Sequence, residues 1–353
     1  MSASAPAVGI GMTLHNRAAY LPAAIETLLA QSFSNFTLTL VDDGSEDESA
    51  EIAGRYVGQD ARVEYVRLPE RRGMVEAWRA AFDRATARGQ HYFAWASDHD
   101  QWHPEWLATL AGVLDAHPAV VLAYPLTQRV DPGGAPLAKP ARQFETIGVA
   151  DLDARWRLLN RSDSVAAGDM VYGLMRTDAV RDAGIFRHVL CPDRLLVAEL
   201  TLRGEIRQVP DVLWYRRQFA VGSVERQRDT LFPPGTPPPS RFVAPWWMHA
   251  RSLWQVYGAS AASRSIVPRG TMRVLVIRYA AAFAWRHYAK SSVQHGILTA
   301  LGWPRWLYKR IKHAVLLAVY GVLVALRQIG VTPLVERLCA RFTGRSRPWR
   351  GHA

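Results

Sequence analysis

The sequence predicts an α/β fold with a doubly wound, mostly parallel sheet, followed by an α-helical region. Short apolar, β-branched segments alternate with segments of helical periodicity through the first 125 residues, which is the pattern of successive βα units. A proline-rich stretch at 233–245 then interrupts the chain. Beyond it, helical periodicity continues with little strand character, which indicates a second region of different architecture.

Each element of the alternating part is predicted from its own local pattern. Apolar and β-branched runs predict strands, and apolar residues spaced three and four apart predict helices. The expected strands are Ala7–Met12, Phe36–Val41, Val63–Arg67, Tyr92–Ala96 and Val120–Pro125. The expected helices are Tyr20–Gln31, a segment from Ser45 or Asp47 to about Val57, Arg72–Arg88, and Pro104–His117, which begins with a proline.

The rhythm changes after residue 125, where Asp131–Gly134 predicts a turn within a hairpin or excursion. Further helices are expected at Asp151–Leu159, Thr177–Ala183 and Leu195–Arg203, and further strands at Met170–Arg176 and Val212–Arg217. We therefore expect residues 126–220 to complete the sheet as a mixed α/β half.

The domain organisation follows from these patterns. We expect an α/β domain over 1–232, a semi-rigid linker over 233–245 and a basic, amphipathic helical region over 246–353. The helices expected in the last region are Trp246–Tyr257, Thr271–Lys290, Pro304–Gln328 and Pro333–Phe342.

The positive charge belongs to the C-terminal third. Residues 251–353 hold 17 Lys and Arg against one acid, within a chain of net charge +12. The apolar run Ala314–Leu326 would span roughly 20 Å as a helix, short of a ~30 Å hydrocarbon core. We therefore expect an interfacial helix on an anionic membrane surface, with an oligomer interface or plain core helices as the alternatives. Nucleic acid is not expected as a partner, because no recognised binding motif is present.

The cellular compartment is expected to be cytoplasmic. Cys191 and Cys339 provide no disulfide framework, which suits a reducing environment. The N-terminus lacks the basic and apolar segments of a secretory signal. With the basic tail, this predicts a peripheral protein on the cytoplasmic face of the membrane.

Acidic residues follow two of the expected strands. Asp42-Asp43-Gly44-Ser45 follows the second strand, and Asp98-His99-Asp100 follows the fourth. Open α/β sheets bind ligands at the carboxyl ends of their strands, and paired carboxylates can hold a hard divalent cation that bridges to phosphate. The alternatives are an Asx turn with a helix cap at the first motif and a solvated acidic helix N-terminus at the second.

Taken in order, these motifs resemble family 2 glycosyltransferases with the GT-A fold. The resemblance rests on Val8–Asn16, Asp42–Ser45 and Asp98–Asp100. Tyr172–Arg176, Asp193–Leu200 and Trp214–Arg217 look like later blocks of the same family, so the resemblance covers roughly residues 7–220.

The resemblance implies roles for the residues on the donor side. Thr13 and Asp43 match positions that line the nucleotide pocket, with Asp43 on the base. Asp100 matches the metal-binding acid, and Asp98 matches the first acid of that motif. Many relatives carry adjacent acids where this chain has His99-Asp100, so the metal ligand is expected among Asp98, His99 and Asp100.

The resemblance also implies the reacting groups. Asp193 matches the catalytic base beside the acceptor, and Arg216 and Arg217 fall where a loop can close over the diphosphate. Two departures concern neighbouring positions. An asparagine found near Trp78-Arg79 in many relatives is missing, and Arg194 stands where other relatives have a second acid.

The implied activity is inverting transfer of a sugar, dependent on Mn²⁺ or Mg²⁺, from a nucleoside-diphosphate sugar to an acceptor hydroxyl. The basic, amphipathic tail by itself predicts that this acceptor is a glycan or a lipid-linked molecule presented at the membrane surface. UDP and dTDP are the expected nucleotides. A sugar-1-phosphate nucleotidyltransferase is the first alternative, but its glycine-rich triphosphate loop is not expected here, because Gly9 and Gly11 lie inside a strand. A non-catalytic membrane adaptor is the second, and the intact acids argue against it.

Overall fold

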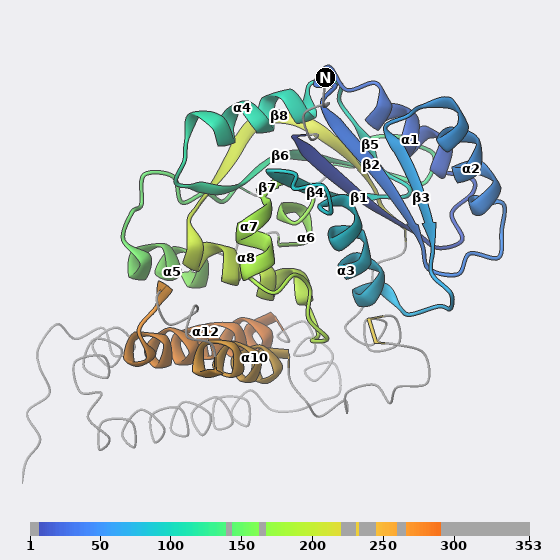
Figure 1. The fold of residues 1–353 in the computed structure, drawn as a ribbon. Helices are drawn as coiled ribbons and strands as arrows, with labels where there is room; N and C mark the ends of the chain where they lie inside the picture. Colours follow the sequence, from blue (N-terminus) through green and yellow to red (C-terminus); the bar gives the residue numbers. More distant parts are fainter. Residues whose placement is uncertain are drawn as a thin grey trace, which may run out of the picture. The chain divides into compact units, whose positions relative to one another are not determined.

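The computed structural model describes residues 7–138, 143–161, 167–219, 231–232, 245–259 and 266–290 (Figure 1). The chain divides into two compact units, Met1–Ala280 and Ala281–Ala353. The sheet and the helices that pack on it belong to the first unit, including α10, which lies beyond the proline-rich stretch. Residues 233–244 of that stretch lie outside the described residues.

The first unit is built on an eight-stranded sheet of order β3-β2-β1-β4-β7-β6-β8-β5. The strands are β1 Val8–Leu14, β2 Phe36–Asp42, β3 Val63–Arg67, β4 Tyr92–Ser97, β5 Gln101–Trp102, β6 Val120–Val130, β7 Leu174–Arg176 and β8 Glu205–Arg217. Strands β3, β2, β1 and β4 pair in parallel, and so do β6 and β8. The expected doubly wound, mostly parallel α/β fold is thus confirmed.

Strand β7 is antiparallel to its neighbours in the otherwise mostly parallel sheet. It lies between β4 and β6 and runs antiparallel to both, with Met175 opposite Phe93 on one side and Leu122 on the other. The expected strand Met170–Arg176 was too long, because Met170 ends a short helix and only Leu174–Arg176 is extended. Gly173 permits the close approach to β6, since a Cβ there would lie 2.3 Å from the Ala123 carbonyl oxygen.

Helices cover both faces of the sheet, whereas α10 and α12 pack against α5 and α8 (Figure 1). The helices of the described residues are α1 Leu21–Leu29, α2 Ser49–Gln59, α3 Met74–Ala85, α4 Trp106–Ala116, α5 Leu152–Arg161, α6 Ala167–Met170, α7 Thr177–Asp182, α8 Pro192–Arg203, α10 Pro245–Ala259 and α12 Arg269–Lys290. The last two confirm the helices expected at Trp246–Tyr257 and Thr271–Lys290. The other two expected C-terminal helices, with the apolar run Ala314–Leu326, lie outside the described residues. None of the helices that the structure describes is long and apolar enough to cross a membrane.

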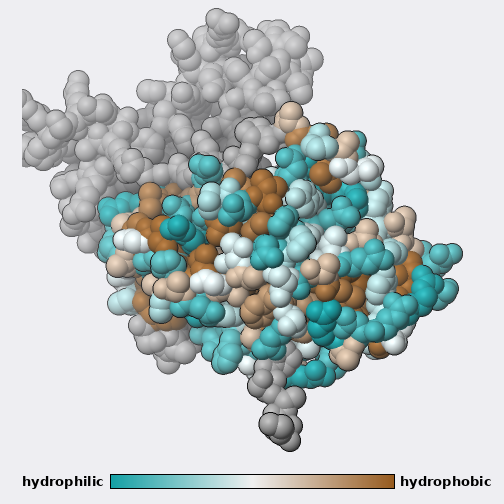
Figure 2. Space-filling model, turned by 90° about the horizontal axis from the view of Figure 1, so that it is seen from above, coloured by the Kyte–Doolittle hydropathy of each residue, from teal (hydrophilic) through white to brown (hydrophobic). Residues whose placement is uncertain are grey.

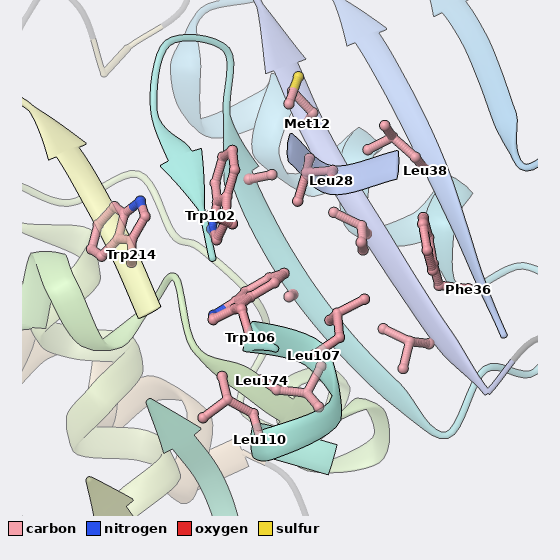
Figure 3. Packing of buried hydrophobic residues seen from close by; sticks show 14 of the residues in the cluster. Met12, Leu28, Phe36, Leu38, Trp102, Trp106, Leu107, Leu110, Leu174 and Trp214 are labelled. Atoms are coloured by element: carbon pink, nitrogen blue, oxygen red, sulfur yellow. The ribbon is translucent and has the colours of Figure 1, made fainter. Parts of the chain in front are cut away.

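The core on one face joins β1 and β2 to α1, α2 and α4. Strand residues such as Met12 and Leu38 are fully buried there in one cluster with Leu28 and Leu107 (Figure 3). The rings of Trp102 and Trp106 lie 5.9 Å apart and extend this core toward β8. On the outside, hydrophilic and hydrophobic residues are interspersed over the face seen in Figure 2.

On the other face, two glycines of β1 allow α3 to approach the strand closely. Gly9 and Gly11 alternate with the core residues of β1, so they face the opposite side. A Cβ at Gly9 would lie 2.1 Å from the Ala85 carbonyl oxygen, and one at Gly11 would lie 2.9 Å from that of Ala81. These glycines therefore serve packing, and no glycine-rich phosphate loop follows β1.

The substitution Gly9→Ala is expected to destabilise the protein by about 3 kcal/mol, because the added methyl group meets backbone that must shift. Gly54→Ala is the matched control. Gly54 is exposed within α2, and its Cβ would meet nothing within 4 Å. That change should stabilise the protein by about 1 kcal/mol through helix propensity. Urea denaturation measures both, and an unchanged midpoint for Gly9→Ala would contradict the packing role.

Helices α10 and α12 are joined to α5 and α8 by buried polar contacts. The Trp156 indole donates to the Leu275 carbonyl oxygen at 2.9 Å. Glu199 is fully buried on α8 and accepts from the Tyr257 hydroxyl at 2.8 Å, and it also pairs with Arg187 and Arg203 at 2.7 and 2.9 Å. A buried carboxylate paired in this way is costly to leave without its partners, so α10 is an integral part of the first unit.

Candidate functional site

The strand order places a topological switch point between β1 and β4. The chain proceeds from β1 outward to β2 and β3, then returns to β4 on the other side of β1. Thr13 lies opposite Val41 on β2 and Ser97 on β4. The turns that follow these three strands are therefore adjacent at the carboxyl edge, where open α/β sheets bind ligands.

His15 connects both acidic motifs, although no sequence pattern singles it out. Its backbone N–H donates to Asp98 Oδ2 at 3.2 Å, and its Nδ1 lies 3.1 Å from the Asp43 carbonyl oxygen. Next to it, Asn16 has a left-handed backbone with φ of +54°, and its side-chain oxygen accepts from the Glu46 N–H at 2.8 Å. The turns after β1 and β2 are thus fastened together beside Asp98.

The acidic motif after β4 forms a compact cluster of carboxylates and imidazole. His99 Nδ1 lies 2.6 Å from Asp98 Oδ1, and His99 Nε2 lies 3.9 Å from Asp100 Oδ1. Both aspartates are buried. Asp100 also accepts from the Arg217 backbone N–H at 2.7 Å, and the Arg217 guanidinium donates to the His99 carbonyl oxygen at 2.6 Å. Two hydrogen bonds therefore join Arg217 to the acidic motif.

The pairing of β5 with β8 produces this contact. Trp102 on β5 lies opposite Trp214 on β8, so the segment after the acidic motif runs alongside the strand that carries Arg216 and Arg217. Both arginines belong to strand β8. Only this long-range pairing brings them to the end of β4.

The donor set of the cluster fits a cation that arrives together with phosphate. No group of three His, Cys, Asp or Glu side chains able to hold a metal occurs in the part of the chain that the structure describes. Mg²⁺ usually takes only one or two carboxylates, with water and substrate phosphates completing its shell. Burial raises the pKa of Asp100, opposed by His99 and by the Arg217 N–H. A nearby cation would favour the ionised form of such a carboxylate.

Asp43 has a local structural role at the same edge. Its carboxylate accepts from the backbone N–H groups of Arg72 at 2.6 Å and Gly73 at 2.9 Å. Gly73 has a φ of +84° and stands directly before α3. Asp43 thus holds the turn into α3, a different helix from the one that the capping alternative concerned, and its contact with a nucleotide base stays a prediction.

Aromatic and basic side chains lie over the acidic cluster. The Arg17 guanidinium is 4.6 Å from the centre of the Phe219 ring, and the Arg217 guanidinium is 4.7 Å from that of Tyr20. Tyr20 and Phe219 pack edge to face at 5.3 Å, and His99 lies 5.1 Å from Phe219. These cation–π and aromatic contacts tie the residues after β8 to the turn after β1.

Asp193 lies in the first turn of α8, beside Arg216. A methyl group at Gly168 would lie 3.2 Å from Asp193 Oδ2 and 3.6 Å from Arg216 Nη1, so the two side chains flank this glycine. Burial raises the pKa of Asp193, opposed by the Arg194 N–H and by the charge of Arg216. A carboxylate with a raised pKa next to a fixed cation is typical of a functional site.

The partners of Arg216 were not found from the sequence. Asp169 on α6 accepts from Arg216 Nη1 at 2.5 Å and from Arg129 on β6 at 2.6 Å. The Arg216 guanidinium lies 5.9 Å from the Tyr172 ring. Arg129 follows the expected strand Val120–Pro125, and Asp169 precedes the expected strand Met170–Arg176. No motif marked either residue as part of a site.

The cluster at the switch point and the Asp193–Arg216 pair are linked through adjacent residues of β8. Arg217 contacts Asp100, and Arg216 lies beside Asp193. Thr13, Asp43, Asp98, His99, Asp100, Arg217, Arg216 and Asp193 are thereby gathered along one edge. Such an arrangement at a switch point is typical of α/β proteins that bind ligands at the carboxyl edge of the sheet.

Comparison with known proteins shows what the chain is similar to. Residues 10–168 match the model of glycosyl transferase family 2. An uncharacterised glycosyltransferase of Haemophilus influenzae is 35% identical over 80 residues, which are 23% of this chain and 32% of that protein. The glycosyltransferase GlyG of Streptococcus pneumoniae is 33% identical over 70 residues, 20% of this chain and 23% of GlyG. The matches thus span about a third or less of these relatives.

Solved structures agree with the fold. Staphylococcus aureus TarS, residues 1–349 in complex with UDP, has a TM-score of 0.51 at 14% identity and covers 82% of this chain and 91% of its own. The complex of the same fragment with UDP-GlcNAc has a TM-score of 0.50 at 14% identity, covering 77% and 79%. The fold is of the GT-A type, as the resemblance implied.

Proposed function

We propose that the protein is an inverting glycosyltransferase that moves a sugar from a nucleoside-diphosphate sugar to a hydroxyl of a glycan or lipid-linked acceptor. The observation that carries the proposal is the link through β8: Arg217 touches Asp100, and Arg216 lies beside Asp193. Asp100 with Arg217 can bind the donor diphosphate, while Asp193 beside Arg216 can serve the acceptor hydroxyl. Both pairs would then act at the same reacting centre.

On the donor side, Thr13, Asp43 and Asp98 would line the nucleotide pocket, and Arg217 would lie at the diphosphate. Asp100, with Asp98 or His99, would hold a divalent cation, Mn²⁺ or Mg²⁺, that neutralises charge on the departing diphosphate. The arginines supply a fixed positive charge for the same purpose, at no cost of reorganisation during the reaction. UDP or dTDP is the proposed nucleotide.

On the acceptor side, Asp193 would take the proton from the attacking hydroxyl as the oxygen reaches the anomeric carbon. A single displacement of this kind inverts the anomeric centre. The raised pKa of Asp193 makes it a stronger base than an ordinary aspartate while leaving it ionised above that pKa. The positive charge of Arg216 favours the ionised form of this carboxylate and so opposes the effect of burial on its pKa.

The experiment that tests the proposal is release of nucleoside diphosphate from a panel of UDP- and dTDP-sugars, with alkyl glycosides as acceptors, with and without Mn²⁺. Metal-dependent release that increases with acceptor supports the proposal. Pyrophosphate formation from a nucleoside triphosphate and a sugar 1-phosphate would instead indicate a nucleotidyltransferase. Nucleotide binding without turnover of any donor would indicate the adaptor and refute the proposal.

We further propose that the C-terminal region docks the protein on the anionic, cytoplasmic face of a membrane. Trp247 and Trp254 are 56% and 47% exposed on α10, one helical heptad apart, with exposed Arg251 between them. The Arg273 guanidinium lies 5.5 Å from the Trp254 ring. Exposed tryptophan beside arginine suits the interface of an anionic leaflet.

The double substitution Trp247→Ser and Trp254→Ser should weaken binding to phosphatidylglycerol vesicles at least about tenfold, because both rings would lose their interfacial burial. Leu158→Ser is the control, since Leu158 is 40% exposed on α5. Vesicle co-sedimentation at low and high salt measures the effect. Equal binding to neutral vesicles, or no change in the double variant, would refute the docking surface.

A further inference from the structure

The turn that carries Asp193 into α8 has an unusual backbone. Cys191, at the N-cap, has a φ of +55°, in the left-handed region that a residue with a Cβ rarely adopts. Pro192 follows at the first helical position and fixes the next φ angle. Such a conformation costs free energy and persists where surrounding contacts hold it. The direction of Asp193 therefore depends on what surrounds residues 190–194.

His249 of α10 makes the decisive contact with this turn. Its Nε2 lies 2.6 Å from the Leu190 carbonyl oxygen, and its Nδ1 lies 2.7 Å from the Tyr279 hydroxyl on α12. A carbonyl oxygen can only accept, so Nε2 carries the proton and Nδ1 accepts from the hydroxyl. The Arg194 side chain also hydrogen-bonds the Tyr279 hydroxyl. His249 and Tyr279 thus hold the turn on both sides of Asp193.

The environment keeps this imidazole neutral and fixed. His249 and Leu190 are fully buried, and Tyr279 is 1% exposed. Burial lowers the pKa of His249 to about 3, so the ring stays uncharged at physiological pH. It also stacks on the Tyr279 ring, with centroids 5.8 Å apart and planes 20° apart. One tautomer and one orientation of the ring are therefore maintained.

We propose that His249 is a positioning residue for Asp193: by holding the Leu190 carbonyl, it fixes the turn that aims the carboxylate at the acceptor. The inference rests on the proposed function, in which Asp193 is the base. It assigns the helices after the proline-rich stretch a part in completing the reaction site. An error of about 1 Å in the position of a reacting group can cost about 100-fold in rate.

The test compares His249→Phe with Tyr257→Phe in the full chain. His249→Phe keeps a ring but loses both hydrogen bonds, and kcat for UDP release should fall about tenfold to a hundredfold, while the Kd for UDP with Mn²⁺ stays within about twofold. His249→Gln, which can still donate to Leu190, should recover part of the loss. Tyr257→Phe removes a different contact of α10, the hydrogen bond to Glu199 on α8, and should leave kcat unchanged.

A second readout separates positioning from a general loss of stability. In an Asp193→Asn background, His249→Phe should cause no further loss of kcat, because the residue acts through the missing carboxylate. An equal loss in both backgrounds, or an equal loss in Tyr257→Phe, would overturn the inference. Should His249→Phe not fold, Tyr279→Phe takes its place: it removes a single oxygen, and kcat that matches wild type in this folded variant would refute the positioning role.

The outcomes for the inference and for the proposed function are distinct. Absence of UDP release by the wild-type protein, with every donor and acceptor in the panel, contradicts the glycosyltransferase proposal itself. Wild-type activity that His249→Phe leaves intact contradicts the positioning role alone.

Discussion

Replacing Asp193 by asparagine is expected to lower kcat for sugar transfer about 100- to 10,000-fold, while UDP binding changes by less than about twofold. The amide cannot accept the proton of the attacking hydroxyl. It nearly preserves the volume of the side chain beside Arg216 and Gly168, so the fold and the donor site should persist. Initial rates with a UDP-sugar and calorimetric titration with UDP measure the two effects.

Asp193→Glu is the informative companion to this change. It keeps the carboxylate but moves it by one methylene, so activity should fall less than in Asp193→Asn. Because the base must be ionised, wild-type kcat/KM should decline as pH falls through the pKa of Asp193, which burial raises above that of an ordinary aspartate. Full turnover by Asp193→Asn would remove this residue from the mechanism, and Arg216 would then need a different partner in the reaction.

The second large effect is expected at the acidic cluster. Asp100→Asn should weaken UDP binding about 100-fold in Mn²⁺ and by less than about twofold in EDTA, because the amide is a much poorer ligand for a hard cation. The asparagine oxygen can still accept from the Arg217 N–H, so the β8 contact should survive. Calorimetric titration in both conditions gives the two constants.

Parallel substitutions resolve which atoms hold the cation. Asp98→Asn and His99→Ala, measured in the same two conditions, should show the metal-specific loss only where the side chain is a ligand. An equal loss with and without Mn²⁺ in Asp100→Asn would show that its charge acts on Arg217 and not on a cation. No loss in any of the three variants would remove the metal from the proposal.

The local elements of the α/β part were largely predictable. Strands β1, β2 and β4 are buried almost throughout, so they consist mainly of apolar residues, and such runs can be recognised in the sequence. The acids after β2 and β4 could be assigned to a common edge, because successive parallel strands end on the same side of a sheet. Asp43 and Asp98 lie close to each other at that edge, since His15 contacts both residues.

The contacts among the residues on the acceptor side could not be predicted in the same way. This side of the site combines residues from four elements: Asp193 of α8, Arg216 of β8, Asp169 of α6 and Arg129 of β6. From its sequence neighbours alone, each could equally be a helix cap or a charge exposed to solvent. Their contacts depend on β7 entering antiparallel between β4 and β6 and on β8 pairing with both β6 and β5. Hydrophobic periodicity reports which residues are buried but not which strand is the neighbour.

The C-terminal region shows the same division. Its basic composition and its helices at α10 and α12 were apparent from the sequence, and they suggested a membrane surface. The burial of His249 against Leu190, 59 residues away, could not be predicted from the sequence. The sequence by itself determined the periodic elements and the acids at the strand ends, because these depend on local spacing. The tertiary structure alone decided which charges meet, because strand order and helix docking are set by long-range packing.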